Sequence, residues 1–307
     1  MRENRKIIDA HSHLLPSEII TQASFYSEDW GKVERQLETM EKIGIDISIL
    51  SYPTTDVSYN GQLTESQEAK LYNEAMSKIV KRYPDKFFWT ALTPILDGKA
   101  GAELKRAKEE LGAKGISLSS SYSGVYLDDE RFFPIYKNAL DLTLPIFVHA
   151  TTNKPIGYDS VEDPLLTPVI EFLFDLTICV GKLLMSGTLE RFSELTFIFP
   201  HFGGVLPFLK ERFDTTYTML KRRGYVRDLG SLPSDHLKKI YVDVSGTTSP
   251  PTIECALELF DADHILWGSD YPSNTKASES LTGIEELTIP DSDKAAILGK
   301  NIEQILG

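Results

Sequence analysis

The sequence contains little of what marks several common classes of protein. Only two cysteines, Cys179 and Cys255, occur in 307 residues, which is too few for a disulfide framework. No block of five or more basic residues is present and the formal net charge is −13, so nucleic acid and anionic membranes are not expected as partners. Three charged side chains interrupt the most apolar stretch, residues 164–189, and the first residues lack the apolar segment of a signal peptide. We therefore expect a cytoplasmic protein.

Short β-rich segments alternate with helical segments along the whole chain. Eight segments have the length and the apolar content of strands that are buried on both faces. They are residues 6–11, 46–52, 87–93, 115–120, 144–150, 195–201, 239–245 and 264–270. Apolar residues at helical spacing occupy the intervals between them. This alternation predicts an α/β fold, a (β/α)8 TIM barrel formed as one domain by residues 1–307.

The connections after the strands separate this fold from its alternative, a doubly wound sheet. Such a sheet usually has a glycine-rich phosphate turn after its first strand, and the sequence HSHLLP at that point is not one. Residues 14–30 and 151–165 follow the first and fifth strands and are longer than a short turn requires. We expect them to be loop insertions at the C-terminal face of the barrel, where barrel active sites are built.

Two histidines, His11 and His13, end the first predicted strand. Side chains two positions apart on a strand point the same way, so both imidazoles are expected to face the barrel mouth. Taken alone, this pair fits a metal site and a histidine-containing turn equally well.

Three residues elsewhere in the chain favour the metal site. His149, His201 and Asp270 also end predicted strands, and strand ends converge on one face of a barrel. We predict that His11, His13, His149 and Asp270 bind a divalent metal, with Zn²⁺ preferred and Mn²⁺ as the alternative. The two remaining histidines, His236 in a polar segment and His264 at the start of the last predicted strand, are expected to lie outside the site.

The fourth strand indicates that one metal ion is present, not two. A two-metal site of this kind needs a bridging ligand, typically a carboxylated lysine at the end of that strand. The strand ends in SLSSS, and Lys114 precedes it at the wrong end.

His201 and Asp270 are the candidate catalytic residues. An imidazole with an ordinary pKa near 6.5 can act as an acid or a base at neutral pH. Gly203 and Gly204 follow His201 and permit a tight turn into a helix. The alternative is that these glycines only allow close packing and that His201 is a fifth, looser ligand.

Four sequence motifs together resemble the amidohydrolase superfamily. They are DAHSH (9–13), FVHATTN (147–153), FPHFGG (199–204) and WGSDYP (267–272). Within it, the chain is similar to the amidohydrolase-related group of aminocarboxymuconate-semialdehyde and resorcylate decarboxylases. The more specific blocks are residues 127–150 and 186–214, and the resemblance extends over nearly the whole chain. It implies metal ligation by His11, His13 and His149, with Asp270 binding the metal or lying within reach of it. It also implies catalysis by His201 and a homo-oligomer, dimer or tetramer.

The substrate contacts are predicted from position alone. Leu14, Tyr52, Tyr122 and Tyr271 are candidates to line the mouth around a flat ring, although each could equally be structural packing. The loop after the second strand contains no arginine to hold a substrate carboxylate. Lys154, the metal or a neighbouring subunit could hold it instead, and a solvated loop lysine is the alternative for Lys154.

These residues predict a metal-dependent, non-oxidative decarboxylase of a hydroxylated aromatic or unsaturated carboxylic acid. The same parts could serve a hydrolase that cleaves a lactone, amide or ester with metal-activated water, or a hydratase. A barrel that keeps the ligands but only binds or supports a partner is the third class.

Overall fold

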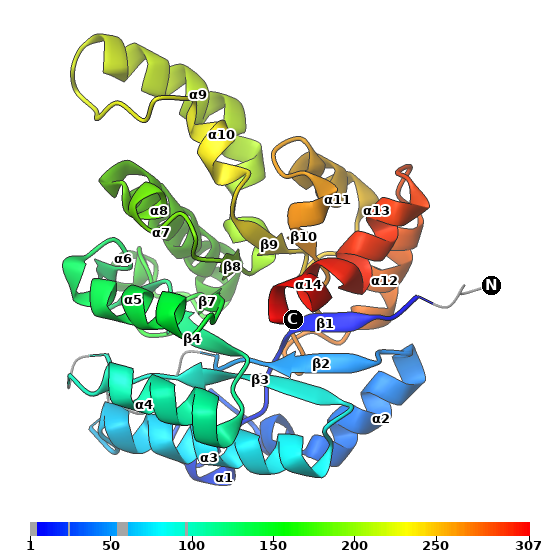
Figure 1. The fold of residues 1–307 in the computed structure, drawn as a ribbon. Coiled ribbons are helices and arrows are strands. Elements are labelled where there is room, and N and C mark those ends of the chain that lie inside the picture. The colour runs from blue at the N-terminus through cyan, green and yellow to red at the C-terminus, as the bar shows by residue number, and fades with distance from the viewer. Residues whose placement is uncertain (1–4, 24, 54–60, 96–97) are drawn as a thin grey trace.

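The computed structural model describes residues 5–23, 25–53, 61–95 and 98–307, and its central feature is a sheet of eight parallel strands (Figure 1). In sheet order these are β1 (Ile8–Ser12), β2 (Ile47–Leu50), β3 (Phe87–Leu92), β4 (Gly115–Ser119), β7 (Ile146–His149), β8 (Phe197–Phe199), β9 (Tyr241–Asp243) and β10 (Ile265–Leu266). Hydrogen bonds from Ala10 N to Trp267 O and from Asp270 N to His11 O join the last strand to the first. The predicted (β/α)8 barrel is confirmed, and each of the eight predicted strands overlaps an observed one.

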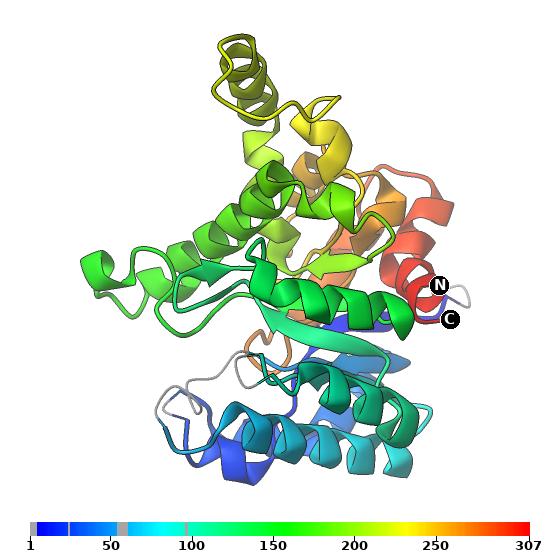
Figure 2. The same ribbon diagram turned by 60° about the vertical axis from the view of Figure 1, so that its left-hand side comes forward.

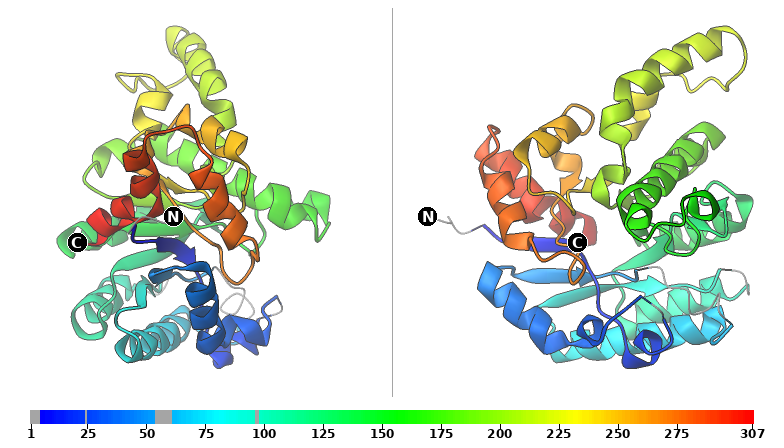
Figure 3. Two further views of the ribbon diagram at one scale, coloured as in Figure 1. Left: turned by 90° about the vertical axis from the view of Figure 1, so that its right-hand side faces the viewer. Right: turned by 180° about the vertical axis from the view of Figure 1, so that it is seen from behind.

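Helices surround the sheet in every view (Figures 2 and 3). The α-helices are α1 (Ser17–Ile20), α2 (Val33–Ile43), α3 (Glu65–Arg82), α4 (Ala100–Arg106), α5 (Phe133–Asp141), α6 (Tyr158–Val161), α7 (Phe172–Ser186), α8 (Thr188–Arg191), α9 (Leu206–Arg222), α10 (Pro233–Leu237), α11 (Pro250–Leu257), α12 (Ala277–Glu285), α13 (Asp291–Ala295) and α14 (Asn301–Leu306). Figure 1 shows α9 projecting from the barrel. Within the described ranges, no helix has the length and apolar character needed to cross a membrane.

Shorter elements complete the chain. A two-stranded antiparallel ribbon follows β4 and consists of β5 (Ser121–Tyr122) and β6 (Val125–Tyr126). Single turns of 3-10 helix are η1 (Glu28–Gly31), η3 (Glu130–Phe132), η5 (His201–Gly203) and η6 (Ala262–His264). The π-helical turns are η2 (Ala107–Leu111), η4 (Thr167–Glu171) and η7 (Ala296–Lys300). The segments predicted as insertions, 14–30 and 151–165, follow the carboxyl ends of β1 and β7 and contain α1, η1 and α6.

Helix ends follow local sequence signals. Gly44 ends α2 with a left-handed φ of 87°, as its position after the apolar stripe predicts. Thr64 begins α3 through a capping box, in which its hydroxyl accepts a hydrogen bond from Gln67 N and the Gln67 side chain accepts one from Thr64 N. These signals fix where each helix starts relative to the strand beside it.

Two buried layers separate the inside of the barrel from its outside. Alternate strand residues, among them Ile8, Ala10 and Leu266, pack together with Ile302 of α14. Residues of the opposite alternation, such as Trp89 and Ile116, pack against the surrounding helices. Ile8, Ala10 and Leu266 come from different strands, and their side chains pack together. Side chains of different strands can pack in this way only on the inner face of a closed sheet, so this group fills the lower barrel interior.

Candidate metal centre and active site

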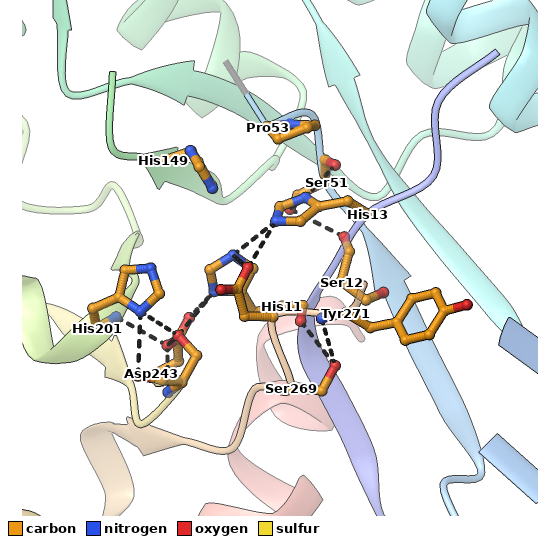
Figure 4. Close-up of polar contacts among 12 residues, drawn as sticks. His11, Ser12, His13, Ser51, Pro53, His149, His201, Asp243, Ser269 and Tyr271 are labelled. Atoms are coloured by element: carbon orange, nitrogen blue, oxygen red, sulfur yellow. Dashed lines mark hydrogen bonds and ion pairs between the residues drawn. The ribbon is translucent and has the colours of Figure 1, made fainter. Parts of the chain in front are cut away.

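The structure brings four side chains of the predicted metal site together at the carboxyl ends of the strands. One nitrogen each from His11, His13 and His149 and one carboxylate oxygen from Asp270 lie within 4.8 Å of one another. In Figure 4 the rings of His11 and His13 lie next to each other, nearly perpendicular with an interplanar angle of 83°, and His149 points toward them. Imidazole and carboxylate ligands at this separation could hold one divalent cation.

A β-bulge in the first strand turns the two histidines inward. The pairing of β1 with β2 shifts register between Asp9 and Ser12. Before the shift, Ala10 belongs to the interior cluster. After it, the Ser12 hydroxyl contacts Gln36 of the outer helix α2 at 3.1 Å. Strict alternation would have placed the histidines outside, so the extra residue is what aims them at the mouth.

Gly268 provides the space that His11 occupies. A Cβ atom at Gly268 would lie 2.7 Å from the His11 Cβ and 3.3 Å from the Asp243 Cγ. The first distance is shorter than van der Waals contact allows, so only glycine fits beside the His11 side chain.

Each of the three histidines uses Nδ1 for a structural contact. The His11 Nδ1 lies 2.9 Å from the Asp243 carboxylate. The His13 Nδ1 donates to the Ser51 carbonyl oxygen at 2.9 Å, and the His149 Nδ1 donates to the Ala150 carbonyl oxygen at 2.9 Å. A proton on Nδ1 leaves the lone pair of Nε2 available to a metal, which is the arrangement that partners behind metal ligands impose.

The Nε2 atoms of His11 and His13 lie only 3.0 Å apart. With both Nδ1 atoms protonated, two lone pairs meet at this distance, and a positive charge must lie between or beside them. Burial opposes the charged form of His11, but Asp243 and Asp270 outweigh burial and raise its pKa to about 9. Burial lowers the pKa of His13 and of His149. A proton on His11 would supply that charge, and so would a metal cation bound by both Nε2 atoms.

Asp270 supplies the negative charge of the cluster from the segment after β10. Its Oδ1 lies 3.4 Å from the His13 Nε2 and 3.6 Å from the His11 Nε2. Burial opposes ionisation, but the hydrogen bond of His13 and the charge of His11 outweigh burial and lower the pKa of Asp270. Its φ of 57° is unusual for a non-glycine residue, and such strain persists where the surroundings fix a side chain for function.

His201 lies beside the four-residue cluster without belonging to it. Its ring centroid is 5.4 Å from that of His11. Its Nδ1 lies 2.9 Å from the Ser245 hydroxyl, which leaves Nε2 directed away from Ser245. His201 and Phe202 have φ values of 52° and 61°, so the turn that the following glycines were expected to permit begins at the histidine itself. A catalytic role for His201 stays a prediction.

Asp243 is the site residue that our sequence reasoning missed. It ends β9, and its carboxylate contacts the His11 Nδ1 at 2.9 Å and accepts from the backbone N–H groups of His201 and Ser245 at 3.0 and 2.9 Å. Burial opposes its ionisation, but the charge of His11 outweighs burial and lowers the pKa of Asp243 to about 2. Its place near the carboxyl end of the predicted strand 239–245, two residues before Ser245, was the signal that could have revealed it.

The predicted substrate contacts are dispersed. Leu14 is 1% exposed and packs in the outer core. Tyr52 is buried, and its hydroxyl donates to Glu68. Lys154 is exposed and lies 3.9 Å from Asp159. In Figure 4 the ring of Tyr271 points away from the histidines. The structure therefore does not gather these four side chains around the cluster, and their roles stay predictions.

A further aromatic side chain, Trp30, contacts the cluster from the insertion after β1. Its ring stacks on His13 with centroids 5.7 Å apart and an interplanar angle of 19°. The backbone N–H and C=O groups of Trp30 both form hydrogen bonds within this insertion. The carbonyl oxygen of Trp30 accepts from Leu15 N at 2.9 Å. The insertion therefore packs directly on a predicted metal ligand.

The remaining histidines and the fourth strand agree with the sequence-based expectations. His264 lies immediately before β10, at the opposite end of the barrel, and stacks on Tyr241. His236 lies in α10 and contacts the Leu229 carbonyl oxygen at 3.0 Å. Lys114 immediately precedes β4, at the amino end of that strand.

The fold and the cluster define a (β/α)8 barrel with a histidine–carboxylate centre at its mouth. The chain belongs to the amidohydrolase family, whose sequence model matches residues 8–307. The resemblance noted in the motifs is thereby confirmed.

Relatives of known name extend over most of the chain. The chain is 22% identical over 278 residues to 2-amino-3-carboxymuconate-6-semialdehyde decarboxylase of Dictyostelium discoideum, covering 89% of this chain and 76% of the relative. It is 24% identical over 283 residues to gamma-resorcylate decarboxylase of Polaromonas sp., covering 89% and 86%. It is also 24% identical over 290 residues to 2-keto-4-carboxy-3-hexenedioate hydratase of Sphingobium sp., covering 88% and 81%.

A solved structure supports the fold. The 5-carboxyvanillate decarboxylase of Novosphingobium aromaticivorans, complexed with manganese and 4-hydroxy-3-methoxy-5-nitrobenzoic acid, superposes with a TM-score of 0.83 at 22% identity. The match covers 99% of this chain and 97% of that protein.

Proposed function

We propose that this protein is a metal-dependent, non-oxidative decarboxylase of a hydroxylated aromatic or unsaturated carboxylic acid. The observation that carries the proposal is the convergence of three histidines, each with Nδ1 engaged behind it, and the Asp270 carboxylate on one point at the barrel mouth. The names of the relatives support the reaction class, since two of them are decarboxylases of carboxylic acids.

The residues divide between metal binding and proton transfer. His11, His13, His149 and Asp270 would hold the ion. A divalent ion held there would supply a positive charge that orients the acid. In decarboxylation the bond to the carboxyl carbon breaks, its electron pair stays on the substrate carbon, and a proton replaces CO₂. His201 and Asp270 are the proposed proton carriers, and the Ser245 contact holds the His201 ring beside the cluster.

The metal is proposed to be Zn²⁺ or Mn²⁺. The ligand types favour Zn²⁺, whereas the solved decarboxylase contains manganese. Metal analysis of the purified protein, followed by removal with a chelator and reconstitution with each ion, decides between them.

A hydratase is the second candidate function. The Sphingobium relative is named as a hydratase of an unsaturated acid. The same residues could therefore add water to the substrate instead of releasing CO₂. The relatives described above do not favour the alternative of a lactone, amide or ester hydrolase.

The test is CO₂ release from a panel of acids by the metal-loaded protein. The panel contains salicylate, 2,6-dihydroxybenzoate, 5-carboxyvanillate and an unsaturated dicarboxylic acid. We expect at least one acid to lose CO₂, and we expect His11→Ala/His13→Ala to abolish both metal binding and turnover. His201→Asn should keep the metal and lose turnover. Hydration of the unsaturated acid without CO₂ release would support the hydratase instead.

We also propose that the chain forms one domain in a homo-oligomer, a dimer or tetramer, in the cytoplasm. Exposed large apolar side chains gather in and near residues 156–174, where Leu165 and Val169 are 68% and 53% exposed, and Phe208 of α9 is 84% exposed. Large exposed apolar patches mark interaction sites. The cytoplasmic location is proposed from the low cysteine content, two residues in 307. Light scattering of wild type and Leu165→Asp/Phe208→Asp measures the oligomeric state.

A further inference from the structure

We propose that the Ser119 hydroxyl binds the acid substrate, by donating a hydrogen bond to one of its oxygen atoms. This inference rests on the proposed function, because it assigns a substrate contact in the same site. It concerns the anchoring of the carboxylate, for which the loop after β2 offers no arginine.

Ser119 faces the same interior as the histidine cluster. In the pairing of β4 with β7, Ser119 is opposite His149, and Ser117 is opposite Phe147. Registered residues of parallel strands point to the same face, and neighbouring strands lie about 4.8 Å apart. Phe147 belongs to the interior cluster, whereas Leu118 packs in the outer core. Ser119 is thus the residue of β4 that sits beside a predicted metal ligand at the barrel mouth.

The hydroxyl of Ser119 has no hydrogen-bond partner among the described residues, although the side chain is only 3% exposed. Its backbone N–H is satisfied by the Tyr122 hydroxyl at 2.9 Å, so only the side chain lacks a partner. A buried hydroxyl without a partner is unfavourable, and such groups in folded proteins are uncommon.

The other serines of the same segment have structural partners. The Ser117 hydroxyl contacts Thr90 at 2.5 Å and accepts from Tyr52 N at 2.9 Å. Those of Ser120 and Ser121 donate to the Asp175 carboxylate at 2.5 and 3.3 Å. Among the hydroxyl groups of these serines, that of Ser119 is therefore the one without a hydrogen-bond partner in the described residues. Ser119 is also the serine at the interior position nearest His149.

The chemistry of the proposed substrate supplies what Ser119 lacks. A carboxylate or an adjacent phenolic oxygen is a strong acceptor, and an acid held next to His149 presents both within reach of the neighbouring strand. A hydrogen bond from a neutral hydroxyl to a charged oxygen is shorter and stronger than one between neutral groups. It would fix the orientation of the acid without adding a charge to the site.

The experiment compares Ser119→Ala with Ser117→Ala, a matched serine of the same strand and face. For Ser119→Ala we expect KM for the turned-over acid to rise about 10- to 100-fold, with kcat changed much less, metal content unchanged and Tm not lowered. For Ser117→Ala we expect the reverse pattern, a lower Tm with KM within about twofold, because Tyr52 N and the Thr90 hydroxyl each lose a hydrogen bond to the Ser117 hydroxyl.

Salicylate binding to the metal-loaded proteins, measured by calorimetry, separates this inference from the proposed function. Wild-type turnover with an unchanged KM in Ser119→Ala overturns the Ser119 contact and leaves the decarboxylase intact. Weaker salicylate binding in Ser119→Ala without any turnover supports the contact and overturns the decarboxylase. Absence of both binding and turnover overturns both.

Discussion

The mouth of the barrel and its opposite end each carry a histidine beside an aspartate, in contrasting surroundings. At the mouth, the His11 Nδ1 lies 2.9 Å from the Asp243 Oδ2, and both side chains are buried. At the other end, the His264 Nδ1 lies 2.8 Å from the Asp263 Oδ1, and the Asp263 side chain is 71% exposed. Water screens the exposed pair, whereas each partner of the buried pair depends on the other for its charge. Burial therefore distinguishes the His11–Asp243 pair beside the metal site from the His264–Asp263 pair at the surface, although the N–O distances are nearly the same.

The two ends also differ in what holds them together. The interior below the site is an apolar layer of strand residues that includes Ile198 and Leu266, sealed by Ile302 of α14. The mouth contains polar side chains and residues with positive φ, such as His201 and Asp270. The apolar end stabilises the barrel and allows the mouth to keep strained, charged residues.

The largest expected effect is on stability, from a change at the apolar end. Ile302→Ala removes a 1% exposed side chain from the interior layer and should lower the free energy of unfolding by about 2–5 kcal/mol. Denaturant unfolding measures this loss, while metal content should stay at the wild-type level. Gln304→Ala, on the exposed side of the same helix, is the control. Loss of metal in Ile302→Ala would show that the two ends are not separable.

Removal of the metal should affect the mouth and spare the fold. The ligands come from β1, β7 and the segment after β10, so a bound ion ties distant segments together. At a free metal concentration 100 times Kd, the ion should add about 2.7 kcal/mol to the stability. Thermal unfolding with and without a chelator, monitored by circular dichroism, checks this. An unfolded metal-free protein at 25 °C would contradict the prediction that the apolar end suffices for folding.

Gly268→Ala should displace the His11 side chain at the mouth of the barrel, because the added methyl group overlaps with it. The new Cβ would lie 2.7 Å from the His11 Cβ, and overpacking of this kind costs roughly 1–3 kcal/mol. We expect lower stability together with weaker metal binding, because His11 must move. Gly181→Ala in α7 is the matched control, since its nearest neighbour is 3.9 Å away. Unchanged metal affinity in Gly268→Ala would mean that His11 is not a ligand.

Asp243→Asn should weaken the metal site without removing a ligand. An amide cannot replace the carboxylate that orients His11, and loss of such a partner typically lowers metal affinity or activity about 10- to 100-fold. Asp263→Asn makes the same change in the exposed pair and should have no effect on either quantity. A metal titration of both variants tests the difference. If Asp243→Asn and Asp263→Asn bind the metal with equal affinity, the buried pair does not differ from the exposed pair in its effect on the metal site.

Much of the architecture was accessible from the sequence because its signals are local. Apolar runs bounded by turns predicted eight strands, and the order of strands and helices limited the fold to a barrel. Once a barrel was expected, the convergence of His149, His201 and Asp270 followed from their places at strand ends.

The positions of the candidate substrate contacts could not be predicted in the same way. Tyr271 ends up pointing away from the histidines, and side-chain direction in the segments after strands has no fixed period.

The sequence by itself determined where the strands lie along the chain and, apart from Asp243, which residues at their carboxyl ends can carry metal-binding chemistry. These depend on spacing and residue type, which neighbours in the chain define. Only the tertiary structure decided that His11 and His13 face inward, because a bulge opposite β2 changes the alternation. It also decided that Asp243 stands behind His11 and that Gly268 makes room for it. Those contacts join residues more than 200 positions apart, and pairing between strands, not local pattern, brings them together.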